Sequence, residues 1–346
     1  MKIFSKLYWS TACLLALTST HAETIELHGS GATFPAPLYA RWISEYNKRN
    51  SNVKVDYQAI GSGGGIKALL DRGVDFAGSD APLDEERMKS APGKLIHIPT
   101  VSGPVAVIYN VPELKSLTLN ASVLADIYLG KITKWNDAKI AALNPASTLP
   151  DLDLVAVHRS DGSGTTWIFT NYLCKVSSEW KKKVGNGTSV NWPTGIGCRG
   201  GDGIGGCVTT TPGSIGFVEL AYAENAKLAS ATLINKAGKP VRPTLEGVKE
   251  ACLHSGSDIP EDLRITITDA DGDSSYPICG FTYLLVYEDL SNLKSKDRAT
   301  ELIKFIDWCL HDGQQYASPG YVALSPILLE KVNATLKSVK YDSAKE

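Results

Sequence analysis

The chain has 346 residues, and its 35 lysines and arginines against 37 aspartates and glutamates give a formal charge of −2. This balance excludes a broad basic field of the kind that recruits nucleic acid or an acidic membrane surface. Without such a field, an anionic ligand has to be held by local dipoles and one or two placed cations. The length suits about two domains.

The first 22 residues have the pattern of a secretory signal peptide. Lys2 and Lys6 precede an apolar run at 11–18, which is too short to span a membrane, and small residues occupy the cleavage-site positions before residue 23. Cleavage leaves 324 residues with a formal charge of about −4, since the removed segment holds two lysines and no acid. We therefore expect a soluble exported protein.

From residue 23 onward, a unit of strand, glycine-rich loop and helix repeats. The predicted strands lie at 24–27, 53–57 and 74–78, and predicted helices follow the first two, at 38–46 and 66–73. Alternating strands and helices predict an α/β fold with mostly parallel sheets, whose ligand site lies beyond the carboxyl ends of the strands. Three of these ends carry Thr33, Ser62 and Asp80.

The sequence HRSDGSGTT at 158–166 follows a predicted strand at 154–157 and leads into an apolar helical pattern. Ser163 or Thr165 is the expected N-cap of that helix. Gly162 and Gly164 allow close approach to the unpaired amides of a helix start, which describes an anion site. Arg159 supplies a planar charged fork, and Asp161 is expected to hold the guanidinium in place.

The remaining pattern continues the α/β alternation. Strands are predicted at 105–110, 214–218 and 281–287, helices at 121–136, 171–184 and 300–310, and a long glycine-rich loop at 195–206.

Six cysteines remain after signal cleavage, which indicates disulfides in an oxidising compartment and allows 15 full pairings. Cys198 and Cys207 lie nine positions apart across a glycine-rich segment, so we predict that they are joined. The alternative is that each pairs with a distant cysteine. The other use of cysteines, a zinc site, is not indicated, because the sequence has no paired Cys-x-x-Cys motifs with nearby histidines.

Six segments together resemble the PstS family, the periplasmic phosphate-binding proteins of high-affinity phosphate ABC importers. They are GATFPAP at 31–37, GSGG at 61–64, SDAPL at 79–83, DIYLGKI at 126–132, RSDGSGT at 159–165 and PGSIGFVE at 212–219. The resemblance implies a two-lobed, type II-like binding protein with the ligand in the cleft between lobes. It places lobe I at 23–108 and 280–346, and lobe II at 109–279.

The resemblance also implies a set of phosphate contacts and a delivery partner. The residue that braces the arginine without touching the ligand corresponds to Asp161. Departures from the family are Gly63, where relatives often have serine, the Thr165-Thr166 pair, and the cysteines at 198 and 207. The expected partners are inorganic phosphate and the permease subunits of an ABC transporter, and we expect a monomer without cofactor or metal. The implied contacts are Thr33, the backbone of Phe34, Ser62, Asp80, Arg159, Ser163, Gly164 and Thr165.

The chemistry of these residues agrees with a phosphate ligand. Hydroxyls and backbone amides are neutral donors for a buried oxyanion, and Arg159 adds a charge-assisted pair. A carboxylate at Asp80 suits a ligand that carries a proton, because hydrogen phosphate can donate to it and sulfate cannot.

Two alternatives stay open at this stage. One is a secreted phosphatase-like hydrolase, which would need a nucleophile with an adjacent base or a metal pair. His158 is the only histidine near the motif, and on a strand its side chain points away from the face of Arg159, so we predict no catalytic residue. The other is a binding protein for sulfate, molybdate or an organic phosphate.

Overall fold

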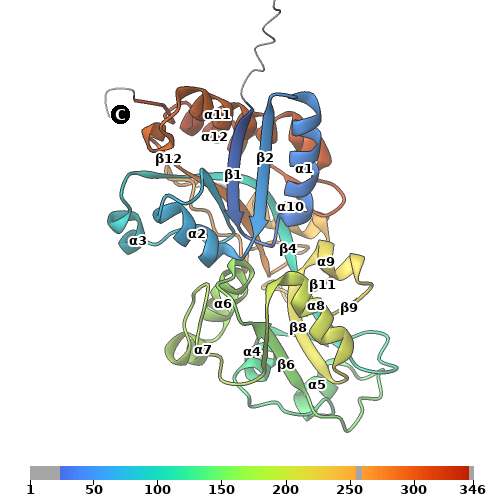
Figure 1. The fold of residues 1–346 in the computed structure, drawn as a ribbon. Helices are drawn as coiled ribbons and strands as arrows, with labels where there is room; N and C mark the ends of the chain where they lie inside the picture. Colours follow the sequence, from blue (N-terminus) through green and yellow to red (C-terminus); the bar gives the residue numbers. More distant parts are fainter. Residues whose placement is uncertain (1–23, 255–258, 343–346) are drawn as a thin grey trace, which may run out of the picture.

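The computed structural model describes residues 24–254 and 259–342, which form two halves, one above the other in Figure 1. The predicted signal peptide lies outside the described residues. Within them we find no helix with the length and apolar character that crossing a bilayer requires.

The strands follow the order β2-β1-β3-β12-β4-β8-β6-β7 across both halves. The strands that lead into the three glycine or aspartate loops are parallel, as predicted: β1 (Ile25–Gly31) pairs with β2 (Val53–Ala59) and with β3 (Phe76–Ser79). The centre is antiparallel, so the sheet is mixed rather than mostly parallel. There β4 (Leu95–Asn110) carries the chain out of the upper half and β12 (Cys279–Tyr287) carries it back, so the two run in opposite directions.

Strand β4 belongs to both halves. Its first part, through Pro104, pairs with β12, and from Val105 to Asn110 it pairs with β8 (Ser214–Glu219). The segment by which the chain returns to lobe I lies beside β4, since the Val105 amide donates to the carbonyl of Ile278, the residue before β12, at 2.7 Å. We propose the division into lobe I (23–108 and 280–346) and lobe II (109–279), with one boundary inside β4 and the other beside the first residue of β12.

Helices α1 (Ala36–Arg49), α2 (Ser62–Leu70), α11 (Lys296–Leu310) and α12 (Pro326–Leu336) surround the lobe I strands (Figure 1). The apolar faces follow the sequence pattern because every third or fourth side chain turns inward. The predicted helix near the C-terminus is confirmed, with Leu302, Ile306 and Cys309 all fully buried.

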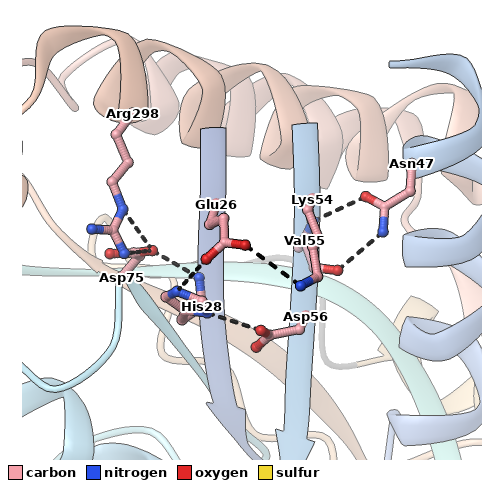
Figure 2. Close-up of polar contacts among 8 residues, drawn as sticks. All are labelled: Glu26, His28, Asn47, Lys54, Val55, Asp56, Asp75 and Arg298. Atoms are coloured by element: carbon pink, nitrogen blue, oxygen red, sulfur yellow. Dashed lines mark hydrogen bonds and ion pairs between the residues drawn. The ribbon is translucent and has the colours of Figure 1, made fainter. Parts of the chain in front are cut away.

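A polar network joins the two ends of the chain in lobe I (Figure 2). Asp75 lies just before β3 and is 4% exposed. Its Oδ2 accepts from the backbone amide of His28 on β1 at 2.7 Å and from Nη2 of Arg298 on α11 at 2.8 Å. This contact supports a lobe built from both ends of the chain.

Lobe II carries the strand β6 (Val155–Arg159) beside β8, with helices around them. The predicted helix at 121–136 ends at Tyr128, because Gly130 takes a left-handed φ of 72° and turns the chain. The predicted helix at 171–184 is two helices, α6 (Gly164–Val176) and α7 (Ser178–Lys183), since Ser177 ends the first and caps the second. This part of the chain also contains α4 (Ala121–Tyr128), α5 (Ala138–Leu143), α9 (Leu220–Asn225), α10 (Leu245–His254), the short strand β9 (Ala229–Ser230) beside β4, and a small sheet of β5 (Thr118–Leu119), β10 (Thr232–Ile234) and β11 (Pro240–Val241).

The prediction of a long loop at 195–206 is wrong. The segment forms β7 (Ile196–Cys198) and α8 (Gly200–Thr210), although five of the eleven helical residues are glycine. The predicted Cys198–Cys207 disulfide is confirmed and spans the start of α8. In the part of the chain that the structure describes, Cys174, Cys252, Cys279 and Cys309 carry free thiols.

Candidate functional site

The glycine loops of lobe I and the Arg159 loop of lobe II touch each other between the two halves of the molecule. The amide of Gly63, in the first turn of α2, donates to the carbonyl of Gly162 at 2.9 Å. A β-carbon at Gly61 would lie 2.6 Å from that same carbonyl oxygen, so the approach depends on glycine. Strand ends from lobe I and the start of α6 from lobe II therefore share one small region, as the sequence predicted.

Arg159 is the charged centre of this region and is 4% exposed. Its Nε donates to Oδ1 of Asp161 at 2.7 Å, and Nη2 donates to Oδ2 of the same carboxylate. Its Nη1 crosses to lobe I and donates to the Thr33 hydroxyl at 3.1 Å. A buried guanidinium is thus fixed along one edge by a carboxylate, and its other edge points at the opposite lobe.

Asp161 has the bracing position predicted for it, and it has a partner that the sequence did not indicate. Oδ1 of Asp161 also accepts from the backbone amide of Gly200, at the start of α8, at 3.1 Å. Burial alone would raise the pKa of Asp161, but the hydrogen bonds and charge of Arg159 and the Gly200 amide hold that pKa below its usual range. The carboxylate therefore stays ionised and keeps the guanidinium oriented.

The N-terminus of α6 supplies neutral donors. Ser163 is the N-cap and its hydroxyl oxygen accepts from the Thr166 amide at 3.0 Å, which leaves the hydroxyl hydrogen free to donate elsewhere. Thr165 is 1% exposed, and its hydroxyl has no hydrogen-bond partner within the described residues. A buried hydroxyl without a partner costs free energy unless a ligand or water satisfies it.

Asp80 and Ser62 face this helix start from lobe I. The Asp80 amide donates to the Ser62 hydroxyl at 3.2 Å, and the Thr282 hydroxyl on β12 donates to Oδ1 of Asp80 at 2.7 Å. A β-carbon at Gly164 would lie 2.4 Å from both Oδ2 of Asp80 and the Ser62 hydroxyl oxygen. The two lobes thus bring Asp80, Ser62 and Gly164 together, and Oδ2 is the carboxylate oxygen that faces lobe II.

The charge of Asp80 depends on pH in the neutral range. Burial raises its pKa to about 7, against the lowering effects of the Thr282 hydrogen bond, the Arg159 charge and the Ser62 hydrogen bond. A proton shared with a ligand oxygen at Oδ2 is therefore energetically accessible near neutral pH.

Thr33 and Phe34 lie just before α1, on the lobe I side of the region. The Phe34 carbonyl accepts from the Tyr321 hydroxyl at 2.6 Å, and the Thr33 carbonyl accepts from the Tyr222 hydroxyl of lobe II at 3.4 Å. These carbonyl contacts anchor the turn, so that the Thr33 hydroxyl meets Arg159.

Sequence reasoning missed two side chains here. One is Thr282, which donates to Asp80. The sequence signal that could have indicated it is a single hydroxyl residue inside an otherwise apolar predicted strand. Glu219, at the end of β8, is 1% exposed, and neither carboxyl oxygen has a hydrogen-bond partner in residues 24–254 or 259–342. Burial raises the pKa of Glu219 to about 8, although the Arg159 charge opposes the shift. Burial therefore favours the neutral form of this acid near the arginine.

His158 points away from the site, as its strand position predicted. Its ring stacks on Trp192, with centroids 4.8 Å apart and planes 12° apart. Across the described residues we also find no group of three histidine, cysteine or acidic side chains placed to share a metal ion.

Comparison with known proteins adds four findings. A family model described as a PBP superfamily domain matches residues 17–312. The chain is 41% identical over 326 residues to phosphate-binding protein PstS of Pasteurella multocida, covering 93% of this chain and 92% of that one. It is 42% identical to phosphate-binding protein PstS of Methanocaldococcus jannaschii, covering 87% and 83%. A solved structure of a putative phosphate ABC transporter substrate-binding protein from Clostridium perfringens, with bound phosphate, superposes with a TM-score of 0.64 at 19% identity, covering 87% of this chain and all of that one.

Proposed function

Because this chain belongs to the PstS family of phosphate-binding proteins, we propose that it binds inorganic phosphate between its lobes and delivers it to a phosphate ABC importer. The family is one of substrate-binding proteins and not of enzymes. For this chain we further propose a monomer in the periplasm that presents its ligand to permease subunits at the inner membrane.

The single observation that carries the proposal is the buried Arg159, held along one edge by Asp161 and facing lobe I with the other. A desolvated guanidinium in this arrangement can donate to an anionic ligand with oxygens on the lobe I side. Around it lie hydroxyls and amides that can donate to further oxygens: Thr33, the Phe34 backbone, Ser62, Ser163, Gly164 and Thr165. We propose these residues, with Arg159 and Asp80, as the phosphate contacts.

Asp80 supports phosphate over other oxyanions. Thr282 occupies its Oδ1, so Oδ2 is the acceptor that remains toward lobe II. Hydrogen phosphate has an O–H that can donate to Oδ2, whereas sulfate at neutral pH can only place an acceptor against an acceptor. The proposed selectivity therefore depends on one ligand proton.

Equilibrium binding of labelled phosphate at pH 8, in competition with sulfate, molybdate and an organic phosphate, tests this function. We expect one phosphate per chain, and a hundredfold excess of sulfate should displace at most about half of it. Displacement by sulfate at concentrations equal to phosphate would rule out the proposed role of Asp80. Incubation with a chromogenic phosphate ester, with and without divalent metals, should release no product.

A further inference from the structure

We propose that the Cys198–Cys207 disulfide is a positioning element for the ligand-binding arginine. It acts through the first turn of α8 and the carboxylate of Asp161. The inference rests on the proposed function, because it takes Arg159 to be a ligand contact.

The disulfide begins directly beside Arg159. Strand β7 pairs in parallel with β6, and in that register Cys198 lies opposite Arg159. The amide of Ser160, the next residue of the arginine loop, donates to the Cys198 carbonyl at 3.1 Å. A constraint on Cys198 is therefore a constraint on the backbone that carries the arginine.

Helix α8 has little stability of its own. Five of its eleven residues are glycine, and its N-cap Arg199 makes no side-chain capping hydrogen bond. Each glycine in a helix interior costs about 1 kcal/mol relative to alanine, so isolated residues with this composition do not hold a helix. The disulfide joins Cys198, two positions before the helix, to Cys207, about two turns inside it, and so limits the unfolding of the first turns of α8.

The first turn of α8 is also where Asp161 is held. The Gly200 amide donates to Oδ1 of Asp161 at 3.1 Å, and the same oxygen accepts from Nε of Arg159 at 2.7 Å. Gly200 has a φ of 75°, a backbone conformation that residues with side chains rarely adopt. The position of its amide therefore depends on the first turn of α8 being folded. When the first turn frays, Asp161 loses a donor and the guanidinium samples more orientations.

The test is a two-by-two set of variants. One change replaces both Cys198 and Cys207 by serine. The other is Gly206→Ala, which strengthens α8 without the disulfide, because residue 206 is exposed and an added β-carbon there meets nothing within 4 Å. Phosphate affinity is measured by calorimetry for the parent, each variant and the combination.

We expect the serine pair to bind phosphate about threefold to tenfold more weakly, the loss that corresponds to one hydrogen bond. Gly206→Ala alone should leave affinity within twofold of the parent. In the serine background it should recover at least half of the lost binding free energy. An affinity within twofold for the serine pair, or a loss that Gly206→Ala does not reduce, overturns the proposal.

Amide hydrogen exchange without phosphate separates this inference from the proposed function. The serine pair should lose protection in α8, and Gly206→Ala should restore it, whatever the ligand is. Unchanged α8 protection overturns the inference even if the parent binds phosphate. If the serine pair does not fold, the same comparison is made on the folded parent after a water-soluble phosphine has converted the disulfide to two thiols and has itself become the phosphine oxide.

Discussion

Replacing Asp80 by asparagine should change which oxyanion the protein accepts. Asparagine keeps the size of the side chain and can still accept from Thr282 at Oδ1, but it presents an N–H donor where Oδ2 faces lobe II. In the parent, sulfate forgoes one charge-assisted hydrogen bond, worth about 1.5 to 3 kcal/mol, and leaves a buried acceptor unpaired at a cost of about 1 to 3 kcal/mol. Sulfate should therefore bind the parent roughly 10² to 10⁴ times more weakly than phosphate.

The variant should recover most of that difference. We expect sulfate affinity to rise by at least about a hundredfold, and phosphate affinity to change by less than about tenfold, because a charge-assisted bond is exchanged for a neutral one. Competition calorimetry and a thermal melt on the same preparation measure both. The matched control is Asp84→Asn. Asp84 is an exposed acid in the same loop and caps α3 (Glu85–Ser90), and asparagine can form the same cap. Unchanged sulfate rejection in a folded Asp80→Asn protein would refute the reasoning.

The pKa of Asp80 gives the same prediction a pH dependence. Burial raises that pKa to about 7, so below it the carboxyl is protonated and can itself donate to a sulfate oxygen. The parent should reject sulfate strongly at pH 8.5 and weakly at pH 5.5, whereas Asp80→Asn should show no such change. A sulfate preference that is constant across this range would contradict the assignment of the proton.

Three further substitutions test other contacts. Arg159→Lys should weaken phosphate binding by about 1.5 to 3 kcal/mol in calorimetry, because a point charge cannot make both bonds to Asp161. A phosphate affinity within twofold of the parent would show that Arg159 is not a ligand contact. Gly164→Ala should weaken binding more than about tenfold, since its β-carbon would lie 2.4 Å from an oxygen of Asp80, and undiminished affinity would show that the lobes need not approach this closely. Burial raises the pKa of Glu219 to about 8, above its value in the unfolded chain, so its contribution to stability is lost as pH rises from about 4.5 to 8. Glu219→Gln should therefore be more stable than the parent at pH 9 and about equally stable at pH 4 in urea unfolding, and a pH-independent difference would mean that Glu219 does not titrate in the fold.

The sequence predicted every strand of four or more residues in the described part of the chain, at least in part, and about half of the helices; α5, α9, α10 and α12 were not predicted. Thr33, Ser62 and Asp80 each follow a predicted strand, and the structure confirms that parallel strands bring these ends together. Local chemistry also narrowed the N-cap to Ser163 or Thr165, because capping depends on residues within one turn, and the structure selects Ser163.

Other features depend on contacts far apart in the chain. Helix α8 was predicted as a loop because glycine composition disfavours a helix, whereas burial of Ile204 and Val208 and the disulfide hold it in place. The partner of Asp80 is Thr282, 202 positions away, and only the return of the chain into lobe I places it there. Local pattern has no access to such pairings.

A crystal structure of the protein grown with phosphate at pH 8 tests the proposed site most directly. We predict a single phosphate between the lobes, with oxygens about 3 Å from the Arg159 guanidinium, the Thr165 hydroxyl and Oδ2 of Asp80. A phosphate bound away from Arg159, or an Asp80 carboxylate that makes no contact with it, would contradict the account.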